Sequence, residues 1–255
     1  MSRFKVHGFV LRGISMGETS RVLTLFTQEN GKLKAVAKGA RKAATSKGGT
    51  LELFSHVACI VYRKEGAELG MISSTDVVDD FSAIAADPKK FGYASAFCEI
   101  IDKATKLDQP ILGLYDLLGE FLQLIASQPA NKAAALFWAS FLKTLALTGY
   151  EPQLFGCAVC GKVNKGQAAF FNASMGGIVC SRDARQNAEY GKLTAETVKL
   201  LQAFASEKLT DLAAIETPQQ ALRRAEQFIL AFDDYHTGLH RNLRSFKFLS
   251  QLKKH

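Results

Sequence analysis

Hydrophobic and polar positions alternate with the period of a β-strand over most of the first eighty residues. The alternation predicts five strands, at residues 3–12, 22–26, 32–38, 51–62 and 69–78. The Asn30-Gly31 dipeptide predicts a hairpin turn between the second and third strands, and residues 13–20 are predicted to form a turn. Five short strands with glycine-marked bends favour a small closed sheet of the OB type, with an SH3-like barrel as the alternative.

From about residue 80 the apolar period becomes helical. Helices are predicted after Pro88, from Pro110 and over 133–147, with Gly149 as the stop of the third. The helical pattern breaks between residues 150 and 190 and resumes near residue 194. The clearest later helix is predicted to start at a capping box, Thr217-Pro-Gln-Gln220. The chain is therefore predicted to be an α+β multidomain protein.

The third predicted strand separates apolar from basic side chains. Leu33, Ala35 and Ala37 share one face, and Lys32, Lys34 and Lys38 share the other. Between residues 32 and 64 eight residues are basic and only Glu52 is acidic. A charge run of this kind is often only a solvated face, but a basic strand face beside a basic loop also suits a phosphate-tracking surface. The predicted phosphate contacts are Lys32, Lys34, Lys38, Arg41, Lys42, Lys47, Arg63 and Lys64.

The overall composition agrees with a polyanionic partner. The 255 residues carry a formal net charge of +8, which fits nucleic acid or an anionic membrane surface. No apolar run approaches the roughly 18 to 20 residues of a membrane span, and residues 1–13 lack the apolar core of an export signal. Five unevenly spread cysteines favour a reducing compartment over a disulfide framework. We therefore expect a cytoplasmic protein without a membrane partner.

Three of the cysteines form a pattern typical of a structural zinc site. Cys157-x-x-Cys160-Gly161 is a metal-binding knuckle, and Cys180-x-x-Asp183 follows about twenty residues later. The predicted ligands are Cys157, Cys160, Cys180 and Asp183, and a metal-free knuckle of the same shape is the alternative. A redox pair lacks its βαβ setting, and a catalytic zinc lacks an accompanying H-x-E or H-E-x-x-H motif.

Signatures of enzymes are absent from the sequence. There is no phosphate-binding G-x-x-x-x-G-K-[ST] loop and no G-x-G-x-x-G after a strand. The adjacent pairs Asp79-Asp80 and Asp233-Asp234 are predicted to be solvated or capping, since adjacent side chains diverge. His236 and His240 are predicted at i and i+4 of one helix, as a satisfied or exposed pair rather than a metal site. We predict that the protein is not an enzyme.

Several motifs in a fixed order add a family resemblance. The motifs are Glu18-Thr-Ser-Arg21, Asn30-Gly31, Ala37-Lys38-Gly39-Ala40-Arg41-Lys42, Leu147-Thr-Gly149-Tyr150-Glu151-Pro152, Cys157-x-x-Cys160-Gly161, Gly176-Gly177-x-x-Cys180, Tyr235-His236-x-x-Leu239 and Arg244-Ser245-x-x-Phe248-Leu249. Together they make the chain similar to the RecO family of bacterial recombination mediator and DNA repair proteins. The similarity covers nearly the whole chain. Asp183 departs from it, because members with a full zinc site carry a fourth cysteine there.

The resemblance implies an N-terminal OB-fold β-barrel at 1–80, a helical bundle at 81–150 and 191–255, and an inserted zinc-knuckle-like module at 151–190. It implies binding of single- and double-stranded DNA, annealing of complementary strands, and help in loading RecA onto strands coated by single-strand-binding protein. The implied partners are RecR and the acidic C-terminal tail of that protein, at the bacterial nucleoid. The alternative from the residues alone is a zinc-ribbon scaffold that binds RNA or other proteins.

Overall fold

The computed structural model describes residues 2–38, 51–184 and 190–252. The chain divides into two compact units, the first formed by Met1–Ser127 with Arg244–His255 and the second by Gln128–Leu243. The α+β fold class is confirmed: a five-stranded barrel comes first, and helices with a cysteine-rich module follow. The finer division into three domains stays a prediction.

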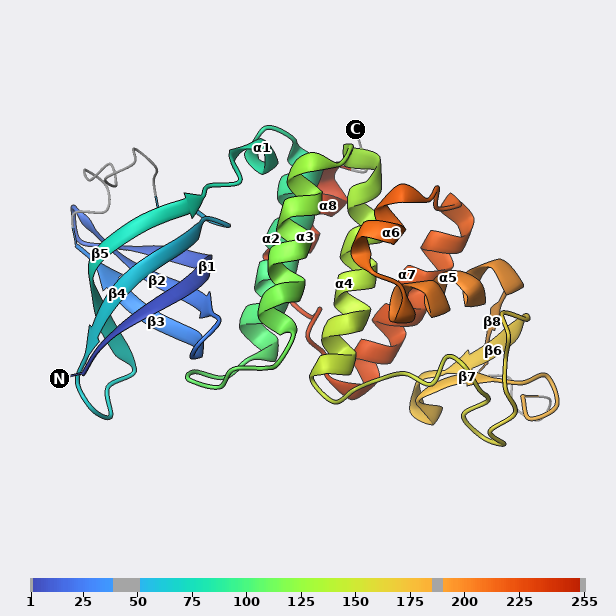
Figure 1. The fold of residues 1–255 in the computed structure, drawn as a ribbon. Coiled ribbons are helices and arrows are strands. Elements are labelled where there is room, and N and C mark those ends of the chain that lie inside the picture. The colour runs from blue at the N-terminus through green and yellow to red at the C-terminus, as the bar shows by residue number, and fades with distance from the viewer. Residues whose placement is uncertain (1, 39–50, 185–189, 253–255) are drawn as a thin grey trace. The chain divides into compact units, whose positions relative to one another are not determined.

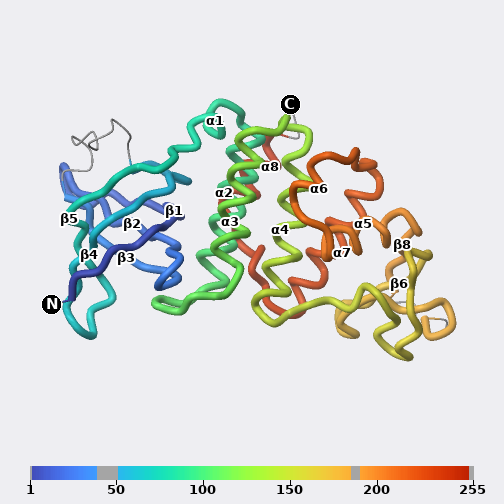
Figure 2. The backbone as a smooth tube through the Cα atoms, in the orientation of Figure 1, coloured from blue at the N-terminus to red at the C-terminus, as the bar shows by residue number. Residues whose placement is uncertain are grey.

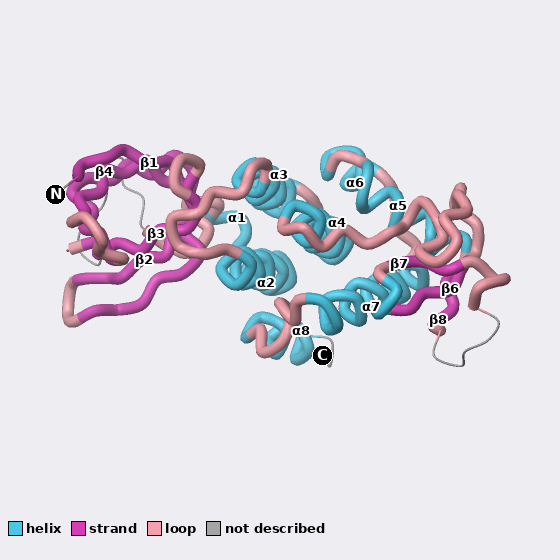
Figure 3. Tube along the Cα trace, turned by 90° about the horizontal axis from the view of Figure 1, so that it is seen from below, coloured by secondary structure: helices cyan, strands magenta, loops and turns pink. Residues whose placement is uncertain are grey.

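The first unit begins with a closed barrel of five strands. The strands are β1 (Ser2–Met16), β2 (Ser20–Thr27), β3 (Gly31–Ala37), β4 (His56–Arg63) and β5 (Leu69–Asp79). Their order around the barrel is β1-β2-β3-β5-β4, and Figure 3 shows them as a ring. Only β3 and β5 pair in parallel, and every other pair is antiparallel. This closure is that of an OB-type barrel, as predicted.

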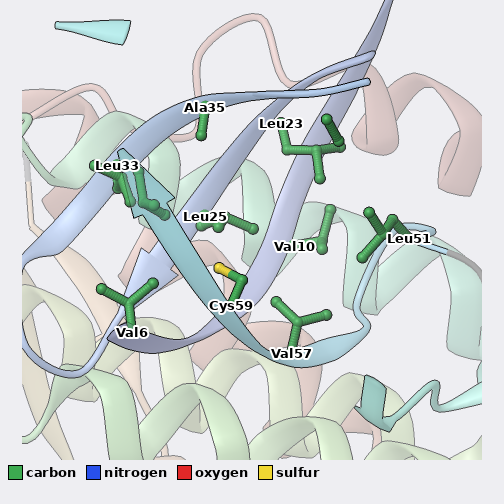
Figure 4. Close-up of a cluster of buried hydrophobic side chains, with 11 residues drawn as sticks. Val6, Val10, Leu23, Leu25, Leu33, Ala35, Leu51, Val57 and Cys59 are labelled. Atoms are coloured by element: carbon green, nitrogen blue, oxygen red, sulfur yellow. The ribbon is translucent and has the colours of Figure 1, made fainter. Parts of the chain in front are cut away.

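The barrel interior is filled by the apolar half of each alternating strand. Leu33 and Ala35 of β3 are fully buried, as are Leu23 and Leu25 of β2, and they pack with valines of β1 and β4 (Figure 4). The buried Cys59 lies in this cluster, and burial is the main cause that raises its pKa to about 12. Cys59 is therefore an inert core thiol.

Two strand predictions differ from the structure. The first strand continues to Met16, because residues 12–16 pair with 20–24 of β2 beyond a bulge between Val10 and Arg12. Residues 51–55 do not belong to β4, which starts at His56. Phe54 instead sits at a φ of 77° and donates its N–H to the Val10 carbonyl. The buried ring of Phe54 packs on Phe91.

Four helices complete the first unit: α1 (Ser82–Ala85), α2 (Pro88–Ala104), α3 (Leu114–Ser127) and α8 (Arg244–Leu252). The Asp87 carboxylate caps α2 by accepting the N–H groups of Lys89 and Lys90. α3 begins four residues later than the predicted start at Pro110. α8 lies beside α2 (Figure 2), and the Glu99 carboxylate accepts the N–H groups of Arg244 and Ser245 at the start of α8. This contact attaches the C-terminal helix to α2 of the first unit.

The second unit contains the remaining helices and a small sheet (Figure 1). The helices are η1 (Ala130–Lys132), α4 (Ala133–Leu147), η2 (Ala173–Met175), α5 (Ala195–Ser206), α6 (Leu209–Ala214) and α7 (Gln219–His236). The strands β6 (Ala169–Asn172), β7 (Gly177–Val179) and β8 (Gly191–Leu193) form an antiparallel sheet in the order β7-β6-β8. α4 ends at Leu147, as predicted, and Gly149, the predicted stop, follows with a φ of 91°. No described helix has the length and apolarity needed to cross a membrane.

Two predictions around α7 are wrong. The Thr217 capping box does not form, because α7 starts after Pro218 without a side-chain cap. His240 does not share a helix with His236, where α7 ends. Instead the fully buried Asp233 accepts the N–H groups of Leu239 and His240 and contacts the His240 ring at 2.5 Å. Asp233 is thus a buried cap of the chain that leaves α7.

Candidate metal centre and nucleic-acid groove

The fold of the second unit brings the four predicted metal ligands together. Cys157 and Cys160 lie on the turn before β6, Cys180 directly follows β7, and Asp183 is three residues further on. Their ligand atoms all lie within 4.8 Å of one another. The Sγ atoms of Cys160 and Cys180 are 3.9 Å apart, and Asp183 Oδ2 is 3.1 Å from Cys180 Sγ. The cluster is compact enough to enclose one ion.

Backbone geometry explains why the knuckle closes. Gly161 adopts a φ of 72°, which favours glycine, and its N–H donates to the Cys157 carbonyl at 2.9 Å. The Cys180 N–H donates to Cys157 Sγ at 3.3 Å, so the second loop contacts the first cysteine directly. Cys157 is buried against Val179 of β7, and it is the most buried of the four predicted ligands. The sheet and the turn together hold the ligands.

The donor set fits a tetrahedral metal ion. Ligands about 2.3 Å from a tetrahedral ion lie roughly 3.8 Å from one another, close to the sulfur separation in the cluster. Burial acts to raise the Cys157 pKa, but N–H groups from Cys160, Cys180 and Val159 outweigh burial and keep that pKa below its usual value. The thiolate is the form that binds metal. These residues can therefore hold a metal ion.

The Asp183 carboxylate has two distinct sides. Oδ2 faces the cysteine sulfurs, while Oδ1 accepts a hydrogen bond from Arg182 Nε at 3.3 Å. Hydrogen bonds from the cysteine thiols, with Cys160 first, keep the Asp183 pKa well below its usual value. One carboxylate oxygen is thus presented to the cluster and the other is held by Arg182.

A groove of about 570 Å³ lies on the outside of the barrel in the first unit. Its lining comes from β1, β2 and β3, from Glu68 before β5, and from the segment at the end of α2. The lining residues are Arg12, Ile14, Val22, Thr24, Lys32, Lys34, Glu68, Asp102, Thr105, Lys106 and Leu107. The groove is predominantly basic, with four cationic and two acidic side chains.

The cations of the groove fall into two classes. Lys32 is bound within the fold, because its Nζ is 3.1 Å from Asp102 Oδ1 and its side chain is only 12% exposed. Arg12, Lys34 and Lys106 have no ion-pair partner among the residues that the structure describes. The acid left to oppose them is Glu68 at the rim, since Asp102 is neutralised by Lys32. These three cations are free to meet an anionic ligand.

The eight predicted phosphate contacts therefore have different surroundings. Lys34 lies in the groove, and Lys38 and Lys64 are exposed elsewhere on the barrel. Arg63, like Lys32, is engaged in an ion pair, 2.7 Å from Asp108. The other three, Arg41, Lys42 and Lys47, lie outside the described residues.

Two cations of the groove, Arg12 and Lys106, are not among the phosphate contacts predicted from the sequence. Arg12 ends the predicted first strand, but the bulge that turns it to the groove side has no clear sequence signal. Lys106 follows α2, and a bridge between Lys32 and Leu107 brings this distant segment to the edge of β3. Lys106 reaches the groove only through this tertiary contact.

Comparison with known families identifies the chain. The family model described as "Recombination protein O N terminal" matches residues 1–81, and the model described as "Recombination protein O C terminal" matches residues 85–245. Together the two models span almost the whole sequence. The chain belongs to the RecO family.

Curated RecO proteins are similar to this chain over nearly their full length. The DNA repair protein RecO of Exiguobacterium sibiricum is 30% identical over 249 residues, which cover 97% of this chain and 96% of that protein. The DNA repair protein RecO of Anaeromyxobacter dehalogenans strain 2CP-C is 33% identical over 253 residues, covering 99% and 98%. The RecO resemblance seen in the sequence motifs is confirmed, and the metal cluster and the basic groove are features of a RecO-family chain.

Proposed function

We propose that the protein acts in DNA repair and recombination as a non-catalytic mediator that binds DNA through the barrel groove. Membership of the RecO family supports the repair and recombination role. The observation that supports the binding site is a set of three cations, Arg12, Lys34 and Lys106, in one groove of an OB-type barrel, none of which forms an ion pair with another described residue. OB barrels bind strands through basic grooves of this kind.

The proposed activities follow from binding by charge. The groove accepts single- and double-stranded DNA, promotes annealing of complementary strands, and assists RecA loading on strands covered by single-strand-binding protein. Contacts to phosphates release counterions, so affinity falls steeply with salt. RecR and the acidic tail of single-strand-binding protein are the proposed protein partners, and the cytoplasm, at the nucleoid, is the proposed location.

Zinc is the proposed ion of the Cys157, Cys160, Cys180 and Asp183 cluster. Thiolates and carboxylates are accepted zinc ligands, and a site whose four positions are all filled by protein is structural rather than catalytic. When bound, the ion cross-links the turn before β6 to the loop after β7. The chain's own residues orient the ligands through the Cys180 N–H and the Arg182 side chain.

Charge reversal tests the DNA site. We expect Arg12→Glu with Lys34→Glu and Lys106→Glu to weaken binding of a single-stranded oligonucleotide at least about 100-fold at low salt. The slope of log affinity against log salt becomes shallower by about 2, because three phosphate contacts are lost. The matched control, Lys165→Glu with Lys192→Glu and Arg223→Glu, has the same net charge and alters exposed side chains of the second unit. Equal weakening in both variants would contradict a groove-specific site.

Annealing separates the mediator from a passive RNA-binding scaffold. We expect the wild-type chain to accelerate pairing of two complementary DNA strands, followed by a fluorophore and quencher on opposite strands. The groove variant loses this acceleration and the control variant keeps it. Binding of RNA in preference to DNA, without any acceleration of annealing, would favour the scaffold instead.

A further inference from the structure

The floor of the groove is formed by the outward face of β2 and β3. Thr24 pairs with Arg12 of β1 on one side and with Lys34 of β3 on the other, so these three residues form one row across the groove. Ile14 and Val22 form the next row. Leu23 and Leu25, the neighbours of Thr24, fill the barrel interior, so Thr24 belongs to the outward face of β2. Thr24 is nevertheless only 7% exposed, because the outer surface is hollowed here.

The three cations that lack an ion pair within the described part of the chain lie on the floor and on both flanks of this hollow. Lys34 comes from β3, Arg12 from β1 on one flank, and Lys106 from the segment that bridges to the far edge of β3. Phosphates carry the negative charge of a DNA strand, and their electrostatic attraction is strongest where cations surround them. The charge distribution therefore draws the sugar-phosphate backbone, rather than the bases, into the groove.

The groove offers no stacking surface to a base. None of its lining residues is aromatic, and the sole aromatic side chain of β2 and β3, Phe26, is 1% exposed and buried in the fold. The sequence from residue 27 to residue 53 contains no aromatic residue either. Elsewhere in the described barrel, the aromatic rings of Phe4 and Tyr62 lie by Arg63 and Arg3 on the paired strands β1 and β4.

Turning the bases inward would add no stacking free energy to binding. OB proteins that bury bases gain about 1–3 kcal/mol for each base stacked on an aromatic ring, and the groove lacks this gain. An inward base would also bring its polar edge against Ile14 and Val22, with loss of hydration.

We propose that the groove holds a single DNA strand by its backbone with the bases directed outward, so that their pairing edges stay open to a complementary strand. This proposal rests on the proposed DNA-binding function of the same groove. It explains how one site promotes annealing: the second strand pairs with a strand that is still bound and held extended. It also accommodates duplex DNA, whose backbone is equally exposed.

Permanganate reactivity tests the orientation of the bases. Permanganate oxidises the 5,6 double bond of thymine when that face is not covered. We expect thymines of an oligothymidylate bound to the full-length protein to react within about twofold of the free strand, because no side chain stacks on them. Protection of the bound thymines by about fivefold or more would overturn the proposal, since it places the bases against protein.

A designed stacking surface supplies the positive control. Ile14 lines the groove and is 49% exposed, so Ile14→Trp adds an aromatic ring there without disturbing the core. We expect this variant to protect bound thymines and to slow annealing relative to wild type. The two proposals fail differently: loss of all salt-dependent DNA binding overturns the binding site itself, whereas intact binding with protected thymines overturns only the outward orientation.

Discussion

At the scale of single residues, Asp183 is the residue that we expect to set the strength of the proposed metal site. Its Oδ2 faces the sulfurs of Cys157 and Cys180, and Arg182 holds the other oxygen. We expect Asp183→Asn to speed zinc release to a chromogenic chelator by at least about 100-fold, and Arg182→Ala by roughly tenfold, because the first removes a charged ligand and the second only its support. Asp183→Cys completes a four-sulfur site and slows release. Equal release rates in all four proteins would exclude Asp183 as a ligand.

Lys32 and Lys34 are neighbours on one strand face with opposite expected roles. Lys34 is unpaired among the described residues, whereas Lys32 is held by Asp102. We expect Lys34→Ala to reduce the salt slope of DNA binding by about 0.7 with little change in stability. Lys32→Ala leaves that slope unchanged and destabilises the first unit by about 1–3 kcal/mol, because Asp102 loses its partner. Fluorescence anisotropy and urea unfolding measure the two effects, and interchanged results would contradict the assignment.

Asp233 couples the stability of the second unit to pH. Burial acts to raise its pKa, but hydrogen bonds from His240 and Thr237 outweigh burial and leave the pKa below its usual value. A carboxyl whose pKa is lowered on folding stabilises the fold above its unfolded pKa, near 3.9, and loses this contribution as pH falls toward the folded value. We expect Asp233→Asn to cost about 3 kcal/mol at pH 7 and much less near pH 3.

The adjacent residue supplies the control for Asp233. Asp234 pairs with Arg241 at 2.6 Å, but its side chain is 54% exposed. Asp234→Asn is therefore expected to lower the free energy of unfolding far less than Asp233→Asn does at pH 7. Urea unfolding at both pH values distinguishes the two variants. Equal losses of unfolding free energy would show that the buried contacts of Asp233 do not stabilise the fold more than the exposed pair of Asp234 does.

At the scale of elements, the backbone at Gln109 approaches the β2–β3 turn closely at Gly31. Gly31 has a φ of 67°, and a Cβ there would collide with the carbonyl of Gln109. Gly17 has a similar φ of 66° with open space around it. We expect Gly17→Ala to cost about 1 kcal/mol, from backbone strain alone, and Gly31→Ala about 3 kcal/mol or more, from strain and overpacking. Hydrogen exchange of barrel peptides measures the destabilisation caused by each variant. Equal destabilisation would mean that the segment at Gln109 moves away from a Cβ at residue 31 without an energetic cost.

Strand and helix positions were largely predictable because they depend on local periodicity. The alternation of Leu33, Ala35 and Ala37 gave the buried face of β3, and the helix at α4 was predicted with its bounds and its stop at Gly149. Element ends were less predictable. The strand extension to Met16 depends on pairing with β2, and the bend at Phe54 depends on a hydrogen bond to Val10. Such partners are distant in sequence.

At the scale of the whole molecule, the metal cluster and the groove belong to different units. We expect removal of zinc with a chelator to lower hydrogen-exchange protection in residues 151–184, because the ion links their loops. The affinity of the groove for single-stranded DNA stays within about twofold, because no groove cation is a metal ligand. Restored protection on adding zinc back is the control, and a large fall in DNA affinity would show that the two units are coupled.

The sequence by itself determined the family, the barrel followed by helices, and the four residues of the metal cluster. These are properties of local pattern and of spacing along the chain, which a single sequence displays directly. Only the tertiary structure decided which cations are free: Asp102 and Asp108 occupy Lys32 and Arg63, while a bulge and a bridge bring Arg12 and Lys106 to the groove around Lys34. The physical reason is that charge is a property of a residue, whereas the pairing of that charge depends on neighbours that folding brings from distant segments.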